Sequence, residues 1–229
     1  MSVFKKALFS TLRVISIGGL ATTGTYAIVT RKNEFQPVDA KTDKLVNSPH
    51  FARLNPEKNP IVHDFCVRKV PLSKIKPELR ENNQELTRAF CAGVWSGEGY
   101  RIQRSVLASN FQNDTTKHQV WEREDLLTSP YDVGTQITDH FEVLEKAPDH
   151  IIVRAGDSPL KTEVRPSDGL FEMSAKINGD VVEFGLKSVF FQGLGKADAK
   201  PMPETIEALH RIYTKILMES AIWNCMGSA

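Results

Sequence analysis

Three side chains that can transfer protons stand close together near the middle of the chain. Asp139, His140 and Glu142 fall within residues 136–145, whose alternation of apolar and polar residues predicts a β-strand. Because strand side chains alternate, we expect His140 and Glu142 on one face and Asp139 on the other, apolar face. A carboxylate beside an imidazole can act as an acid–base pair, and a carboxylate among apolar side chains is a common general acid or base. The alternatives are a solvated polar face for the first pair and a salt bridge for Asp139.

A second group of charges follows between residues 154 and 172. Its members are Arg154, Asp157, Glu163, Arg165, Asp168 and Glu172. Mutual ion pairing explains them most simply, with Arg154 or Arg165 also available to Asp139. The alternative is a polar mouth that orients a ligand. Arg154 is the third catalytic candidate, after Asp139 and His140, because a guanidinium can polarise a bound group.

Several classes of function lack their sequence signature. No serine lies in a GxSxG context, and the glycines of residues 193–196 lack the spacing of a P-loop or dinucleotide fingerprint. The histidines and the three cysteines show no metal-ligand spacing, so neither a cofactor nor a metal is expected. We expect the cysteines to be reduced and partly buried. A net charge of +1 without a basic face argues against nucleic-acid binding.

The elements that position these residues are led by a hairpin at Asn178-Gly179. Asn-Gly between alternating runs favours a type I′ turn, whose two central residues need positive φ. Such a loop fixes the register of the two strands. The predicted cross-strand pairs are Ile177 with Asp180, Ala175 with Val182, Met173 with Phe184, and Phe171 with Leu186. The last three pairs place apolar residues opposite one another on one face of the sheet.

The rest of the folded part is predicted from periodicity and turn residues. Apolar residues at helical spacing predict a C-terminal helix over 203–224 and a broken helix pair over 73–107, interrupted by glycines. The segment 61–70 is predicted to be a strand, and 151–154 returns from 136–145 as another. The polar segment 110–134 is expected to be a loop with embedded structure. These elements indicate an α+β fold of about five strands.

Residues 1–60 differ in composition from the folded part of the chain. Residues 1–33 contain no acidic side chain, and basic residues flank an apolar stretch over 14–29. Three interpretations remain open: a single-pass membrane anchor, a mitochondrial presequence with or without an inner-membrane anchor, and a secretory signal. Residues 34–60, rich in proline and polar side chains, are expected to be a linker or a surface strap. The domain then covers 61–224, with a short tail at 225–229.

The order strand, broken helix pair, antiparallel strands and long C-terminal helix resembles the helix-grip fold of the START and polyketide-cyclase superfamily. The residues that carry the resemblance are Phe141-Glu142-Val143, the Asn178-Gly179 hairpin and 209–213 (Leu-His-Arg-Ile-Tyr). The resemblance implies a curved antiparallel sheet packed on the last helix, with an apolar cavity between them. It implies no shared catalytic residues. The chain is also similar to a group of short membrane-tethered fungal proteins, which implies no mechanism.

Three functions follow from this reading. The first is a membrane-tethered domain that binds an apolar small molecule or lipid in the cavity. The residues expected to line that cavity are Trp95, Phe141, Phe171, Met173, Phe184, Leu186, Tyr213 and Leu217. The second is a cofactor-free cyclase, dehydratase or isomerase in the same cavity, which needs at least two ionisable side chains there. The third is a structural or assembly factor with a filled core.

Overall fold

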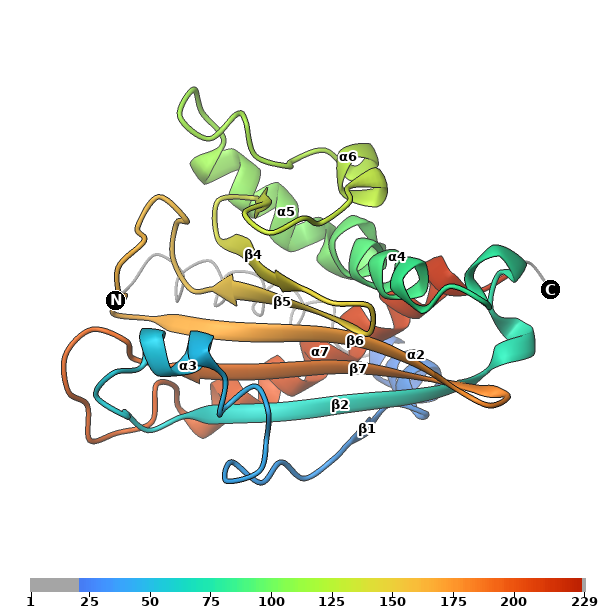
Figure 1. The fold of residues 1–229 in the computed structure, drawn as a ribbon, viewed down its shortest axis with the longest axis horizontal. Helices are drawn as coiled ribbons and strands as arrows, with labels where there is room; N and C mark the ends of the chain where they lie inside the picture. The colour runs from blue at the N-terminus through green and yellow to red at the C-terminus, as the bar shows by residue number, and fades with distance from the viewer. Residues whose placement is uncertain (1–20, 228–229) are drawn as a thin grey trace.

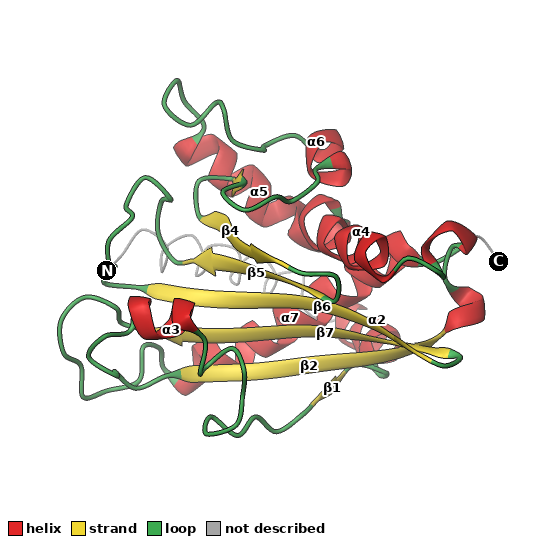
Figure 2. Ribbon diagram, viewed as in Figure 1, coloured by secondary structure: helices red, strands yellow, loops and turns green. Residues whose placement is uncertain are grey.

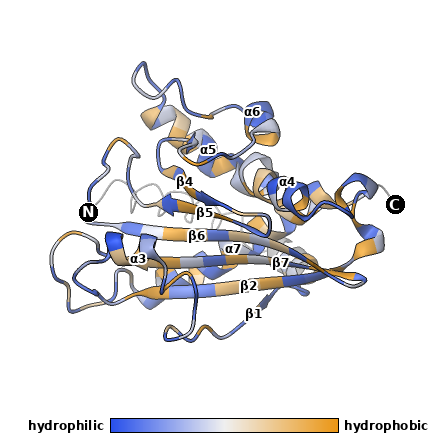
Figure 3. Ribbon diagram, in the orientation of Figure 1, coloured by the Kyte–Doolittle hydropathy of each residue, from blue (hydrophilic) through white to orange (hydrophobic). Residues whose placement is uncertain are grey.

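A computed structural model describes residues 21–227, in which seven strands form one antiparallel sheet. The strands are β1 (Glu34–Phe35), β2 (Val62–Pro71), β3 (Gln136–Ile137), β4 (Phe141–Lys146), β5 (His150–Ala155), β6 (Asp168–Asn178) and β7 (Val181–Phe191). Their spatial order is β1-β2-β7-β6-β5-β4-β3, so the first long strand lies beside the last. Hydrophobic and hydrophilic residues alternate along β2, β6 and β7 (Figure 3), which gives the sheet two distinct faces.

Helices cover both faces of this sheet (Figures 1 and 2). They are α2 (Ala21–Thr30), α3 (Pro49–Leu54), α4 (Asn83–Ser96), α5 (Glu98–Phe111), α6 (Arg123–Thr128) and α7 (Glu204–Cys225), with 3-10 turns at Leu72–Lys74 and Pro77–Leu79. The long helix α7 runs behind the sheet in Figure 1, on the inner face, while α3 lies in front on the outer face. The expectation of an α+β fold with an antiparallel sheet and a packed C-terminal helix is confirmed.

The β6–β7 hairpin forms where it was predicted, but its register differs by two residues. Asn178 pairs with Val181, and Met173 therefore pairs with Leu186 instead of Phe184. The turn residues are Gly179 and Asp180, and Gly179 has a φ of +62°. Glycine at the first central position is typical of a type II′ turn, which requires positive φ there and not at Asn178. A shift by two keeps every side chain on its predicted face.

The predicted break in the first helical region is confirmed at Gly97, between α4 and α5. Asn82 caps α4 by accepting a hydrogen bond from the Glu85 amide, so the regular helix begins later than residue 73. Glycine is also needed where α4 crosses α7. A Cβ at Gly93 would lie 2.6 Å from the carbonyl oxygen of Ala221, closer than atoms can pack. Small residues therefore allow the two helices to approach closely.

The prediction that residues 136–145 form one strand is wrong. The chain turns back between β3 and β4, where Ile137 pairs with Phe141. Thr138 and Asp139 have φ values of +45° and +64°, a conformation that non-glycine residues rarely adopt. Alternation of side chains therefore does not apply across this turn. Two short strands, β1 and β3, raise the number in the described sheet above the five that were expected.

Residues 34–60 pack more closely on the domain than a linker would. Glu34 and Phe35 add an edge strand to β2, and Ser48 caps α3 by accepting from the Phe51 amide. Leu45 and Leu54 are buried against apolar residues of the outer face of the sheet. The segment is thus a strap that covers one face of the sheet and contributes a second, smaller core.

Residues 1–20, which include the first part of the predicted anchor (residues 14–20), lie outside the described residues. The described end of the apolar stretch is α2, which lies along α7: the Tyr26 hydroxyl donates to the carbonyl oxygen of Ile212 at 3.4 Å. Just after α2, the Asn33 amide donates to the carbonyl oxygen of Lys215 at 3.2 Å. Over residues 21–227, no helix has both the length and the apolar character that crossing a membrane requires.

Candidate functional site

A cavity lies between the inner face of the sheet and helices α4, α5 and α7. Its volume is about 60 Å³, room for a few water molecules. Of the eight residues predicted to line it, seven do so: Trp95, Phe141, Phe171, Met173, Leu186, Tyr213 and Leu217. They come from α4, the three strands β4, β6 and β7, and α7. The cavity therefore lies where the sequence places large apolar side chains on facing elements.

Phe184 is the predicted residue that the structure places elsewhere. Its ring packs on Phe90 of α4, with 4.9 Å between ring centroids, in the filled part of the core. At the cavity itself, the Trp95 ring lies 5.1 Å from Tyr100 and 4.7 Å from Phe141. The first contact is edge-to-face and the second is tilted, and together they fix the orientation of Trp95 in the apolar wall.

Four of the polar residues that line the cavity contact one another, and sequence reasoning assigned a role to none of them. They are Asp64 on β2, Ser188 on β7, and His210 and Thr214 on α7. Asp64 and Ser188 are cross-strand partners on the inner face of the sheet, and the Ser188 hydroxyl donates to Asp64 Oδ1 at 2.8 Å. His210 and Thr214 are one helical turn apart, so both face the sheet. All four side chains belong to buried residues.

The hydrogen bonds in this cluster place a proton on Nε2 of His210. Ser188 gives its hydroxyl proton to Asp64, and Thr214 gives its own to the backbone carbonyl of His210 at 3.0 Å. Both hydroxyl oxygens, 3.0 and 3.2 Å from Nε2, must then accept from the ring. Nε2 also lies 3.2 Å from Oδ2 of Asp64. A single N–H therefore faces three oxygens.

Tyr213 supplies a further polar contact across the cavity. Its hydroxyl donates to Oε1 of Gln103 at 2.9 Å, which connects α7 to α5. Burial raises the pKa of Tyr213 well above its ordinary value, so the phenol stays neutral and keeps its proton at physiological pH. The pair offers hydrogen-bonding capacity without adding charge to the apolar wall.

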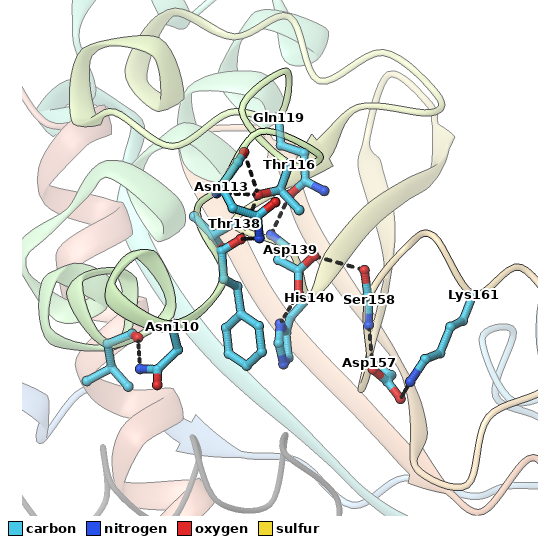
Figure 4. A network of polar contacts seen from close by, with 12 residues as sticks. Asn110, Asn113, Thr116, Gln119, Thr138, Asp139, His140, Asp157, Ser158 and Lys161 are labelled. Atoms are coloured by element: carbon cyan, nitrogen blue, oxygen red, sulfur yellow. Dashed lines mark hydrogen bonds and ion pairs between the residues drawn. The ribbon is translucent and has the colours of Figure 1, made fainter.

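The first predicted catalytic group lies away from the cavity, in the tight turn between β3 and β4 (Figure 4). Asp139 is buried and accepts a hydrogen bond from the Ser158 hydroxyl at 2.8 Å, while its own amide donates to Oε1 of Gln119. Nδ1 of His140 lies 3.4 Å from Oδ2 of Asp139, and its ring packs on Phe111. Neither residue is among those that line the cavity.

These contacts decide between the alternatives for Asp139. Its partners are a serine and a histidine, and not Arg154 or Arg165 as the salt-bridge alternative held. His140 and Glu142 do not share a strand face either, because His140 precedes β4 and sits in the turn. The network links the turn to the loop that holds Asp157 and Ser158 (Figure 4), an arrangement that stabilises a backbone with two left-handed residues.

Arg154, the third catalytic candidate, is occupied by structural contacts. Its guanidinium donates to both oxygens of Asp168 at 3.0 and 2.7 Å, and to the carbonyl oxygens of Thr162 and Glu163. Both members of the ion pair are almost fully buried. The ion-pairing interpretation of this charged group is confirmed for Arg154, which closes the loop before β6. Arg165 is buried beside it and donates to the carbonyls of Lys161 and Asp157.

Over residues 21–227, no group of three or more His, Cys, Asp or Glu side chains is arranged to hold a metal ion. The cysteines were expected to be reduced and partly buried; Cys66, Cys91 and Cys225 are free, and all three are fully buried. Burial raises the pKa of each thiol to about 12. None of them is poised as a nucleophile.

Two weak signals in the sequence pointed to the missed polar cluster. Asp64 falls on the same side of its strand as Cys66, and that side proves to be the inner face of the sheet. His210 flanks the apolar stripe of α7 within one turn of Tyr213. Neither signal pairs the two residues, since only the position of β2 beside β7 brings Asp64 under α7.

No protein-family model, curated protein or solved structure matches the chain.

Proposed function

We propose that this protein binds a small, predominantly apolar molecule in the cavity between the sheet and α7. The observation that carries the proposal is the composition of the cavity wall. Aromatic and aliphatic side chains from α4, β4, β6, β7 and α7 line it, together with a few polar groups that contact one another. Small-molecule sites commonly combine an apolar lining with a small number of placed polar groups.

The arrangement supports the resemblance to helix-grip domains, in which a curved sheet and the last helix enclose a cavity. The order of the described strands and the packing of α7 on the sheet agree with that architecture. We further propose that residues 14–29 tether the domain to a membrane, mitochondrial or other, which would bring it close to apolar ligands. The basic residues on both sides of that stretch support the tether.

The size of the cavity limits the ligand in the described conformation. An engineered protein cavity of about 150 Å³ binds benzene, more than twice the volume found here. The apolar lining residues that are only partly buried are Phe171 and Leu217. Movement of Leu217 is therefore the simplest way to admit a ligand of the size of one aromatic ring, and a lipid chain would need a larger opening.

A second function, cofactor-free proton-transfer catalysis, is favoured by one observation. Asp64 and His210 are two ionisable side chains that line the same cavity, 3.2 Å apart. This pair takes the place of Asp139, His140 and Arg154 in that hypothesis. An imidazole and a carboxylate against an apolar pocket are suited to proton transfer on a bound substrate. Binding precedes catalysis, so the binding test applies to both functions.

The test is calorimetric titration of the full-length protein with toluene. Leu217→Ala enlarges the cavity and should increase the affinity, whereas Leu217→Trp fills it and should abolish binding. The matched control is Ile212→Trp, which places the same side chain on α7 at a more exposed position. It should leave the affinity unchanged. The proposal fails if neither the wild type nor Leu217→Ala binds toluene, or if Leu217→Trp binds as tightly as wild type.

A further inference from the structure

We infer that the cavity selects a ligand that carries a hydrogen-bond donor, a hydroxyl or amine group, on an apolar body, and that Oδ2 of Asp64 accepts that hydrogen bond. The inference rests on the proposed function and narrows the class of ligand. It follows from counting the donors and acceptors of the polar cluster at the cavity wall.

Only one of the two carboxylate oxygens of Asp64 accepts a hydrogen bond. Oδ1 accepts the proton of Ser188, but Oδ2 makes no hydrogen bond among the described residues, although it is buried. Its contact with Nε2 of His210, at 3.2 Å, has the distance of an ion pair without the geometry of a hydrogen bond. A buried carboxylate oxygen that accepts no hydrogen bond is costly, so a donor that reached it would be bound strongly.

The polar cluster has fewer hydrogen-bond donors than acceptors. The Nε2 proton of His210 also faces the hydroxyl oxygens of Ser188 and Thr214. One N–H cannot make three well-aligned hydrogen bonds, and the hydroxyl protons of both neighbours are already used. The cluster is thus short of donors and has acceptor capacity left. Within this cluster, a group that only accepts, such as an ether or ester oxygen, would find no free proton.

Asp64 belongs to the wall of the cavity. Phe171 and Leu217 line the cavity together with it, so the ligand body would lie beside Asp64. The surroundings are otherwise mainly apolar, and a hydroxyl brought into such a cavity without a partner loses the hydrogen bonds it makes to water. A cavity without an acceptor would therefore prefer a methyl group to a hydroxyl. A preference of the cavity for a hydroxyl over a methyl group would therefore indicate that Asp64 accepts the hydrogen bond.

The experiment compares phenol with toluene, two probes of nearly the same shape, by calorimetric titration of the full-length protein. The wild type should bind phenol about tenfold more tightly, the gain expected of a hydrogen bond to a charged group. Asp64→Asn should reduce this preference to within about twofold, because the amide presents a weaker, uncharged acceptor. Asp132→Asn is the control: it makes the same substitution at an exposed carboxylate that does not line the cavity, so the preference should remain.

The outcomes separate the two claims. Equal binding of phenol and toluene by the wild type, or a preference that survives in Asp64→Asn, overturns the inference and leaves the proposed function standing. Failure of both probes to bind wild type and Leu217→Ala overturns both. Should Asp64→Asn not fold, anisole replaces the variant, because its methylated oxygen has no proton to donate. Anisole should then bind wild type as weakly as toluene, and anisole binding as tightly as phenol overturns the inference.

Discussion

Asp64 of β2 and His210 of α7 face each other across the edge of the cavity, with 3.2 Å between Oδ2 and Nε2. The contact joins the first long strand to the last helix and depends on β2 lying beside β7 in the sheet. It places two ionisable groups against a wall that is otherwise largely aromatic and aliphatic. The chemistry of the cavity is thus set by residues that lie far apart in the sequence.

The buried ion pair of Arg154 and Asp168 should be essential for stability. Asp168→Asn leaves the Arg154 guanidinium buried with two backbone acceptors and no counter-charge. We expect a loss of about 3–5 kcal/mol in the free energy of unfolding, measured by urea denaturation. Lys161→Ala is the matched control, because its pair with Asp157 is largely exposed on the lysine side and should cost under about 1 kcal/mol. A loss below 1 kcal/mol in Asp168→Asn would show that the pair is not needed.

The crossing of α4 and α7 predicts a graded response to added methyl groups. Gly93→Ala would bring a Cβ within 2.6 Å of the Ala221 backbone, so the helices must separate. The cost should be about 1–3 kcal/mol, the usual range for overpacking. Gly99→Ala meets its nearest atom at 3.2 Å and should cost less. Thermal unfolding of both variants tests the order, and a Gly93→Ala protein as stable as wild type would refute the close approach.

The cysteine thiols should resist modification in the folded protein. Burial raises the pKa of Cys66, Cys91 and Cys225 to about 12, so almost no thiolate exists at pH 8. A chromogenic disulfide reagent that reacts with thiols should label none of the three in the native protein over minutes. After denaturation in guanidinium, it should label all three. Rapid labelling of the native protein would mean that the inner face of the sheet or the end of α7 opens easily.

His150 predicts a pH-dependent contribution to stability. Burial alone would lower its pKa, but hydrogen bonds to Asp149 and Glu145 outweigh burial and raise the pKa above its ordinary 6.5. The stabilisation is therefore complete below about pH 6.5 and is lost as the pH rises through the folded-state pKa. Since the groups are partly exposed, we expect less than about 1 kcal/mol.

The measurement for His150 is the unfolding free energy of His150→Gln at pH 6 and pH 9. The deficit relative to wild type should be larger at pH 6. His118→Gln is the control, since this exposed histidine contacts the uncharged side chain of Gln136. A deficit that is equal at both pH values would contradict the assignment.

Most of the fold could be predicted because it depends on local patterns. The Asn178-Gly179 hairpin, the break at Gly97 and the long C-terminal helix each have short-range signals, and the structure contains all three. The register of the hairpin differs by two residues from the predicted one, because Gly179 can take either the first or the second central position of a two-residue turn. The sequence does not indicate which of these turns the strands prefer. The faces were still correct because the shift was even.

The polar half of the site was missed for a topological reason. Asp139 and His140 attracted attention because they are adjacent in sequence, but a tight turn removes them from the predicted strand. Asp64 and His210 meet only through a pairing between β2 and β7 and the packing of α7 above them. Such long-range contacts have no local signature. The apolar lining could be predicted because alternation alone assigns residues such as Met173 and Leu186 to the inner face.

The most direct test of ligand binding in this cavity is methyl NMR of the full-length protein during titration with phenol. Binding in the cavity should cause saturable shifts of the Met173 and Leu217 methyl resonances, with nuclear Overhauser contacts to the phenol ring. The methyl resonances of the exposed Leu160 and Leu194 should stay unchanged. Shifts confined to exposed methyl groups, or none up to the solubility limit of the probe, would contradict the account.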